Sequence, residues 1–213
     1  MLGIHDFGLF VIAGLLLNIT PGPDLMYIVG RSAAQGVKAG AAAALGIGAG
    51  CFVHIAAAAL GLSAILAASA TAFAIVKMIG AAYLVYVGIS LLWSLRARVG
   101  QSAQADRTAP PTPLRSIFTQ GFLTNVLNPK VALFFLAFVP QFIDVHAPAK
   151  MLAFLLLGLV FNTNGTLWNL FVAWFAARTI GGLKSTRLAA WLNGCVGALF
   201  VYLGIKLALA RHA

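Results

Sequence analysis

Two charged residues of opposite sign lie inside long apolar segments of this 213-residue sequence, and each directly follows a proline. Asp24 ends the run Thr-Pro-Gly-Pro-Asp at residues 20–24, and Lys130 ends the run Asn-Pro-Lys at residues 128–130. A bilayer tolerates a charge or an interrupted helix only where protein or a water-filled cavity surrounds it. Two such interruptions, at similar places in the two halves of the chain, predict a substrate site in a small transporter.

The first interruption removes hydrogen bonds from the helix that it breaks. Proline has no N–H to donate to the carbonyl four residues earlier, so Pro21 and Pro23 free the carbonyls of Leu17 and Ile19. A helix that restarts here has Asp24 in its first turn, where the helix dipole favours a negative charge. We therefore expect Asp24 to bind the ammonium group of a zwitterionic substrate or, alternatively, to carry a proton.

The second interruption repeats this pattern with the opposite charge. Pro129 frees the carbonyl of Asn125, and Asn128 is suited to cap a helix that restarts at Pro129. Lys130 and the restarting helix N-termini would attract a carboxylate. Two alternatives stay open: the prolines are structural kinks, or Asp24 and Lys130 form an ion pair that merely holds the two halves together.

A histidine lies in the segment that follows the first interruption. Gly46, Gly50 and His54 are four residues apart and share one helix face, on which the glycines allow close approach of another helix. His54 is predicted either to relay protons together with Asp24 or to be a hydrogen-bonded packing residue.

A later apolar segment, residues 151–177, carries two polar faces. Asn162, Gly165 and Asn169 share one face, and we interpret it as the lining of a cavity. The predicted substrate-binding residues are Asn18, Thr20, Pro21, Gly22, Pro23, Asp24, Asn125, Asn128, Pro129, Lys130, Asn162 and Asn169. Asp24 and His54 are the predicted proton-coupling residues.

The composition indicates an integral membrane protein. The chain is 62% hydrophobic and 8% charged, whereas soluble domains have about 25% charged residues. The net charge of +10 is better explained by anionic lipid headgroups than by nucleic acid, because the basic residues lie between apolar segments. Cys51 and Cys195 lie far apart in apolar segments, and no metal-ligand spacing is present, so neither a metal nor a cofactor is predicted.

Six segments are apolar and long enough to cross a bilayer, which takes about 20 residues. The predicted fold is all-α, a polytopic membrane protein in which the first and fourth of six transmembrane helices are broken. The predicted spans are 7–30, 40–67, a third that follows a turn near residues 69–71 and ends near Leu95, 117–140, 151–177 and 188–209.

The linker at residues 96–116 divides the chain into two three-helix repeats, residues 1–95 and 117–213. Because three spans is an odd number, the second repeat is predicted to be inverted relative to the first. Residues 85–91 match residues 201–207 at five of seven positions, and Gly14, Leu16 and Asn18 correspond to Gly121, Leu123 and Asn125.

The distribution of Lys and Arg predicts the orientation. With six spans, nine of these residues lie on the side of the linker and four on the other side. Positively charged loops stay in the cytoplasm, so both termini are predicted to lie outside.

The run at residues 18–24, the glycines that follow it and the Asn-Pro-Lys motif resemble the LysE/RhtB-type amino-acid exporters over essentially the whole chain. The resemblance implies efflux of amino acids or their derivatives across the bacterial cytoplasmic membrane, driven by the proton gradient. The motif residues that it marks are 21–24 and 128–130. Because Asp24 is nearly the only intramembrane acid, we expect a neutral substrate, similar to homoserine, threonine or leucine.

Other classes of function fit the sequence less well. A channel needs a continuous polar lining, a metal-ion exporter needs several charged or soft ligands, and a membrane enzyme needs a nucleophile with a base or clustered metal ligands. The expected partners are the amino acid, protons and the lipid bilayer, without nucleic acid, and a homodimer stays open.

Overall fold

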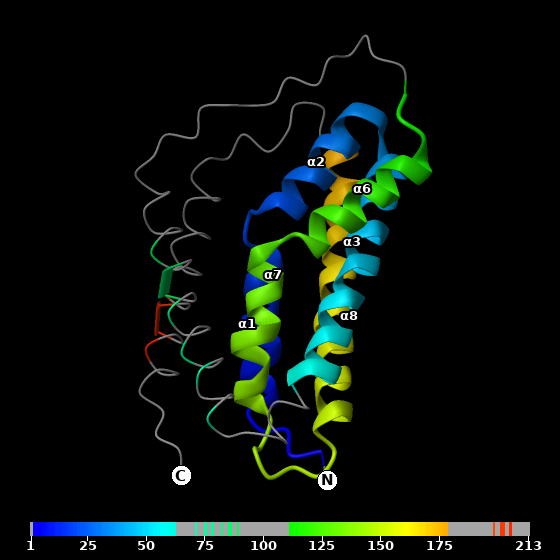
Figure 1. Ribbon diagram of the computed structural model, residues 1–213. Coiled ribbons are helices and arrows are strands. Elements are labelled where there is room, and N and C mark those ends of the chain that lie inside the picture. The colour runs from blue at the N-terminus through cyan, green and yellow to red at the C-terminus, as the bar shows by residue number, and fades with distance from the viewer. Residues whose placement is uncertain are drawn as a thin grey trace.

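The computed structural model describes residues 2–62 and 111–178, together with 11 single helical positions between residues 71 and 205. Every regular element in these parts is a helix, apart from an isolated antiparallel bridge between Ile4 and Ile143. The all-α prediction is therefore confirmed for the described residues. In chain order (Figure 1) the elements are α1 (Phe7–Ile19), α2 (Pro23–Gln35), α3 (Val37–Ala57), the π-helix η1 (Ala58–Leu62), α6 (Leu114–Val126), α7 (Pro129–Leu133), the π-helix η2 (Phe134–Phe138), the 3₁₀-helix η3 (Val139–Phe142) and α8 (Lys150–Arg178).

Both predicted helix breaks are present. The chain bends by 50° between α1 and α2 and by 46° between α6 and the segment Pro129–Phe142. α2 continues to Gln35, beyond the predicted end at residue 30. It can do so because Arg31 is held by hydrogen bonds to Gln120 and Thr112. The helix then ends at Gly36, whose φ of +80° favours glycine.

Four of the six predicted spans lie within the described residues. Val37–Leu62 and Lys150–Arg178 are each long and apolar enough to cross a membrane, and each bent pair passes the same test as one broken span. The segment Lys150–Arg178 matches the prediction 151–177 closely, and Val37–Leu62 matches the prediction 40–67 as far as residue 62, where the first described stretch ends. The third and sixth spans and most of the linker fall largely outside the described residues, as does the turn near 69–71, of which Thr71 is described and helical.

The two broken spans run in opposite directions. At the start of α1 the N–H of His5 donates to the carbonyl of Phe142 (3.1 Å), and along α2 the hydroxyl of Tyr27 donates to the carbonyl of Ile117 (3.0 Å). Figure 1 shows α1 beside α7 in one half of the molecule and α2 beside α6 in the other, with α3 and α8 running past both breaks. The breaks therefore meet halfway along the long helices.

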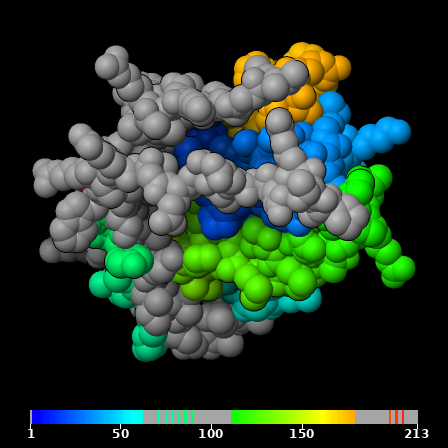
Figure 2. Space-filling model, turned by 90° about the horizontal axis from the view of Figure 1, so that it is seen from above, coloured from blue at the N-terminus to red at the C-terminus, as the bar shows by residue number. Residues whose placement is uncertain are grey.

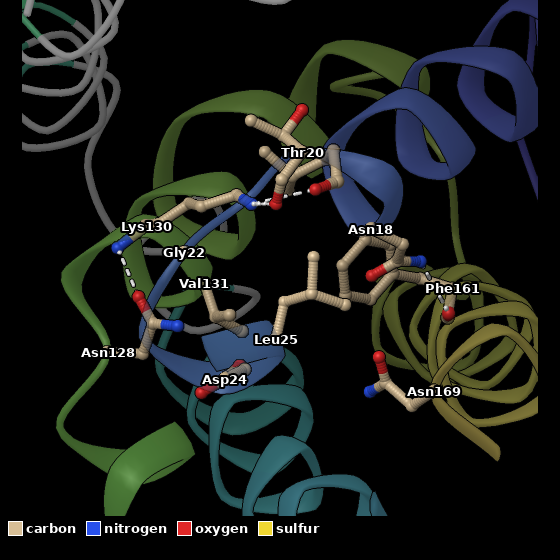
Figure 3. Close-up of a pocket in the computed structure, with 11 residues that line it drawn as sticks. Asn18, Thr20, Gly22, Asp24, Leu25, Asn128, Lys130, Val131, Phe161 and Asn169 are labelled. Carbon is tan, nitrogen blue, oxygen red and sulfur yellow. Dashed lines mark hydrogen bonds between the residues drawn. The ribbon is translucent and has the colours of Figure 1, made fainter. Parts of the chain in front are cut away.

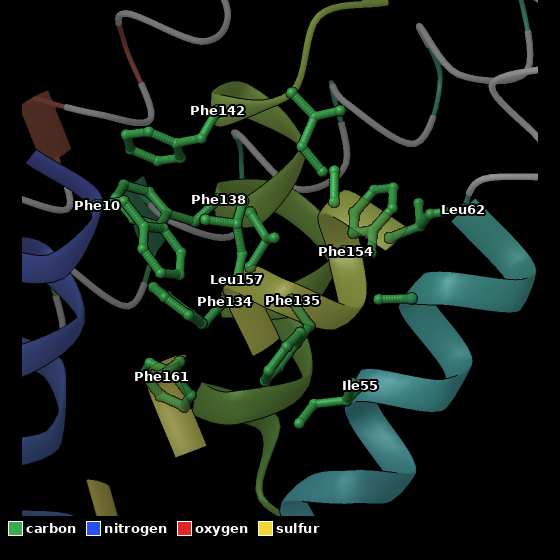
Figure 4. Close-up of a cluster of buried hydrophobic side chains, with 14 of the residues drawn as sticks. Phe10, Ile55, Leu62, Phe134, Phe135, Phe138, Phe142, Phe154, Leu157 and Phe161 are labelled. Carbon is green, nitrogen blue, oxygen red and sulfur yellow. The ribbon is translucent and has the colours of Figure 1, made fainter. Parts of the chain in front are cut away.

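The α1–η3 end is closed by an aromatic cluster, which we define as Phe10, Phe134, Phe135, Phe138, Phe142 and Phe161 (Figure 4). All six side chains are buried. Phe10 meets Phe142 edge to face at 5.3 Å between ring centroids, and Phe134 stacks on Phe161 at 4.3 Å. Burial of apolar area stabilises this end by about 25 cal/mol per Å² removed from water.

Small residues allow α3 and α6 to pack backbone against backbone, as the glycine spacing predicts. A Cβ added at Gly46 would collide with the carbonyl of Phe118, and one added at Gly50 would lie 2.6 Å from the carbonyl oxygen of Phe122. On the facing helix, a Cβ at Gly121 would lie 2.7 Å from the carbonyl oxygen of Ala43. This contact fixes the first half of the second broken span against α3.

Candidate functional site

Lys130 crosses from the second break to the first. Its ammonium group donates to the carbonyl oxygens of Leu17 (2.7 Å) and Thr20 (2.9 Å), two acceptors that we call the carbonyl pair (Figure 3). The Leu17 carbonyl is one that Pro21 was predicted to free. Because these oxygens lie at the C-terminus of α1, where the helix dipole is negative, the contact is favourable for a cation. A lysine of the second half thus caps a helix of the first half.

Asp24 lies in the first turn of α2, as predicted from the restarting helix. Its Oδ2 accepts a hydrogen bond from the side-chain amide of Asn125 at 2.7 Å. Its Oδ1 is buried and accepts no hydrogen bond of ordinary geometry, and the side chain of Asn128 lies near enough to interact with the carboxylate. A carboxylate oxygen in this situation has unused capacity to accept a hydrogen bond.

The alternative of an Asp24–Lys130 ion pair is wrong for this conformation. In the described part of the chain, Asp24 and Lys130 are not in ion-pair contact. The reason is that each charge already has another partner: Asp24 binds an amide, and Lys130 binds the carbonyl pair. The two charges therefore present separate binding groups.

The second break is organised by its own polar groups. The side chain of Asn128 accepts a hydrogen bond from the backbone N–H of Lys130 (3.0 Å), which is the predicted N-cap, with Pro129 at the first helical position. The carbonyl that Pro129 leaves free, that of Asn125, accepts from Asn128 N–H (2.9 Å) and lies 2.9 Å from His54 Nε2. Because a carbonyl can only accept, Nε2 of His54 is the protonated nitrogen. His54 thus has a packing contact, and it also stacks near Phe135.

A cavity of about 30 Å³, which we call the break cavity, lies between the two interruptions. Because about 10–15 Å³ of space open to a water-sized sphere is enough to hold one water, the cavity admits a few waters in this conformation. Seven of the twelve predicted binding residues line it: Asn18, Thr20, Gly22, Asp24, Asn128, Lys130 and Asn169 (Figure 3).

The other predicted residues lie elsewhere. The backbone at the breaks is shaped by Pro21, Pro23 and Pro129. Asn125 does not line the cavity and contacts it through its hydrogen bond to Asp24. Asn162 donates to the carbonyl of Gly48 (3.1 Å) and lines a different, mostly apolar groove of about 580 Å³ between α3, α6 and α8.

Leu17 lines the break cavity too, and its freed carbonyl was predicted as an acceptor for the ammonium group. Three other apolar residues of the cavity, Leu25, Val131 and Phe161, were not predicted. Leu25 and Val131 directly follow the two charges in the sequence, and this adjacency could have suggested them. Nothing in the sequence marks Phe161, which reaches the cavity from α8.

Matching contacts relate the two halves. Gly165 of α8 makes room for Asn18, because a Cβ added at residue 165 would lie only 2.9 Å from Asn18 Oδ1. Gly50 of α3 makes room for Asn125 in the same way, because a Cβ added at residue 50 would lie 2.9 Å from the Cβ of Asn125. Asn18 and Asn125 are the residues that the repeat correspondence pairs, and each packs on a glycine of the other half.

The α2–α6 end is closed by polar side chains, in contrast to the aromatic end. We define the polar cluster as Tyr27, Arg31, Thr112 and Gln120. Arg31 donates to Gln120 Oε1 (2.7 Å) and Thr112 Oγ1 (3.1 Å). The Tyr27 hydroxyl lies 3.1 Å from Gln120 Oε1, and its single proton is shared between this oxygen and the carbonyl of Ile117. Figure 2 views this end, where α6 in green lies against the blue atoms of the first half.

Apolar helices of spanning length, two of them broken around half-buried opposite charges, define a multi-pass membrane protein of the transporter class. The family model described as LysE type translocator matches residues 15–211. The chain belongs to this family of translocators.

The relatives are similar over almost their whole length. The chain is 35% identical to the uncharacterized membrane protein PA4757 of Pseudomonas aeruginosa over 214 residues, covering 98% of this chain and 97% of that protein. It is 31% identical to a leucine efflux protein of Enterobacter sp. strain 638 over 207 residues (97% and 96%). A leucine efflux protein of Salmonella typhimurium is 29% identical over 209 residues (97% and 96%). No solved structure matches the chain significantly.

Proposed function

We propose that this protein exports small neutral amino acids from the bacterial cytoplasm in exchange for protons. The observation that carries the proposal is the break cavity, where a lysine ammonium of one half and acceptor oxygens of the other half, those of Asp24 included, border one space. A zwitterion can pair its carboxylate with the lysine and donate its ammonium to acceptor oxygens of the cavity. Family membership and the names of the leucine efflux relatives support an amino acid as cargo, and leucine is the first candidate.

The substrate site in this proposal consists of the cavity residues together with Asn125. Leu25, Val131 and Phe161 add an apolar wall that suits an aliphatic side chain. Asn162 stays a candidate for substrate contact only in a conformation that joins its groove to the break cavity.

The proposed architecture is a pair of inverted three-helix repeats, residues 1–95 and 117–213, joined by the cytoplasmic linker 96–116. The antiparallel broken spans and the matched Asn18–Gly165 and Asn125–Gly50 contacts support it. Transport then proceeds by rocking of one repeat against the other around the break cavity.

The proposed orientation places the α2–α6 end in the cytoplasm of a cell whose inner membrane holds the protein, with both termini outside. Described basic residues support this, because Arg31, Lys38, Arg115 and Arg178 lie toward the α2–α6 end. The opposite end has Lys150 together with two aspartates, Asp6 and Asp144. Positive charge is retained on the cytoplasmic side.

In the proposed cycle, Asp24 carries the exchanged proton. Its Oδ1 accepts no hydrogen bond of ordinary geometry, so a proton can bind there without breaking the hydrogen bond from Asn125 to Oδ2. His54 is the second proton-coupling candidate, since its Nε2 contacts the backbone of the same asparagine.

Proteoliposomes loaded with radiolabelled leucine test this function. We expect saturable efflux that an inwardly directed proton gradient accelerates, and loss of this acceleration in Asp24→Asn, with leucine counterflow retained. Threonine and lysine serve as a second neutral cargo and a dibasic control. Full proton-driven efflux by Asp24→Asn would exclude the proposed proton role, and preferential efflux of lysine would exclude the neutral cargo.

A further inference from the structure

The ammonium group of Lys130 occupies a site that would equally suit the ammonium group of an amino acid. The carbonyl oxygens of Leu17 and Thr20 accept from it at 2.7 and 2.9 Å, and both residues line the break cavity. Two carbonyls at a helix C-terminus provide acceptors and the negative end of a dipole, which is what a primary ammonium binds. The site requires no feature of lysine beyond its terminal NH₃⁺.

Lys130 is poorly placed with respect to its own helix. It is the second residue of α7, and the positive end of the α7 dipole lies there. The side chain crosses to α1 and is stabilised by a contact with the other half of the protein.

The space beside Lys130 is held open by a glycine. A Cβ at Gly22 would lie 3.6 Å from Lys130 Nζ and 3.8 Å from Lys130 Cδ. Gly22 also lines the break cavity. A carboxylate can therefore approach the ammonium group from the cavity side.

We propose that Lys130 acts as a built-in occupant of the substrate's ammonium site: a zwitterionic amino acid displaces Lys130 from the carbonyl pair, donates its own ammonium to these oxygens, and pairs its carboxylate with the released Lys130. The inference rests on the proposed amino-acid export and assigns the ammonium site within it. Asp24 is then left free for the proton.

The exchange explains selection for zwitterions. An amine alone would take the carbonyl pair but leave the Lys130 ammonium without a partner, which is costly away from water. A carboxylate alone would draw Lys130 away and leave the carbonyl pair unfilled. Lys130 also fills the site in the empty carrier, so the carbonyls are satisfied in the absence of substrate.

The test is chemical complementation of Lys130→Ala in the full-length protein. Propylammonium replaces the part of the side chain that this substitution removes, and its binding is measured by thermal shift and by competition with labelled leucine. We expect propylammonium to bind Lys130→Ala and to weaken leucine binding competitively, whereas wild type and the exposed control Lys38→Ala show neither effect. Leucine itself should bind Lys130→Ala about tenfold more weakly, because a charge-assisted contact with its carboxylate is lost.

The direction in which propylammonium changes the affinity for leucine decides whether both bind at the carbonyl pair. If propylammonium leaves leucine affinity unchanged or tightens it, the substrate's ammonium lies elsewhere, for example at Asp24, and the proposal is wrong. Absence of propylammonium binding to Lys130→Ala would overturn it as well. Where Lys130→Ala does not fold, Lys130→Met preserves the packing of the stem, and the ammonium ion is the probe with the same expected outcomes.

Failure of the proposed function would look different. If wild type binds neither leucine nor threonine, neutral amino-acid export is refuted. The propylammonium arm then still decides whether the carbonyl pair is an ammonium site, since that arm compares wild type with Lys130→Ala without an amino acid.

Discussion

Gly22→Ala should separate transport from stability. The backbone at residue 22 is extended, with φ −163° and ψ −177°, so alanine fits the conformation without strain. The new Cβ would lie 3.6 Å from Lys130 Nζ, which is ordinary van der Waals contact. Replacing glycine in a compatible conformation restricts the unfolded chain and stabilises a protein by about 0.4–1 kcal/mol. The folded state should therefore be as stable as wild type or slightly more stable.

Transport by the same variant should fall. Gly22 lines the break cavity, and the added methyl group takes up part of this space beside the ammonium group of Lys130. One methyl group too many in a binding site costs about 1–3 kcal/mol, or about 10–200-fold. We expect leucine efflux to fall by at least about tenfold.

The measurement is leucine efflux from proteoliposomes alongside the melting temperature in detergent. Gly30→Ala is the matched control, because it lies in the same broken span and a Cβ there meets nothing within 4 Å. It should keep wild-type efflux. Unchanged efflux by Gly22→Ala, with equal amounts of reconstituted protein, would refute the reasoning that substrate binds beside Gly22.

Three further perturbations have defined outcomes. Gly50→Ala brings a Cβ to 2.6 Å from the α6 backbone, so we expect a loss of about 1–3 kcal/mol and a lower melting temperature than Gly30→Ala; equal melting temperatures would contradict this packing. Asn128→Ala removes the cap of α7 and should cost about 1 kcal/mol, whereas Asn128→Ser should retain most of it; equal thermal stability of the two variants would argue against the cap. Arg31→Ala should speed hydrogen exchange of residues 114–120 but not at the aromatic end, and equal changes at both ends would show that the polar cluster is not a separate closure.

The sequence was sufficient to predict the breaks because their causes are local. Proline has no N–H to donate, whatever the tertiary structure. Pro21 and Pro129 therefore each leave one helix carbonyl without its usual backbone partner. The Asn128 cap and the position of Asp24 in a first helical turn follow from the same local rules. The two long helices were also predictable from length and apolarity alone.

The partners across the site could not be predicted in this way. Opposite charges in two apolar segments suggested an ion pair between Asp24 and Lys130, yet the structure satisfies each with uncharged groups. Which carbonyl the lysine reaches depends on the relative position of two helices, and a local sequence pattern holds no information about that position. Asn162 shares a helix face with Asn169, but the orientation of α8 places it against Gly48 instead.

The two charges are held in different ways, and this difference bears on mechanism. Asp24 is favoured by the dipole of its own helix, α2, so relative motion of the halves leaves that stabilisation in place. Lys130 is opposed by the dipole of its own helix and depends on the carbonyl pair in the other half. A rocking motion that separates the halves would therefore take both acceptors from Lys130, whereas Asp24 would lose the hydrogen bond from Asn125 and keep the stabilisation by its own helix dipole. We infer that Lys130 is the charge that changes partners during the cycle. Lys130 should react with an amine-reactive probe at a rate that changes when leucine is added. The same labelling rate with and without leucine would contradict the inference that Lys130 changes partners.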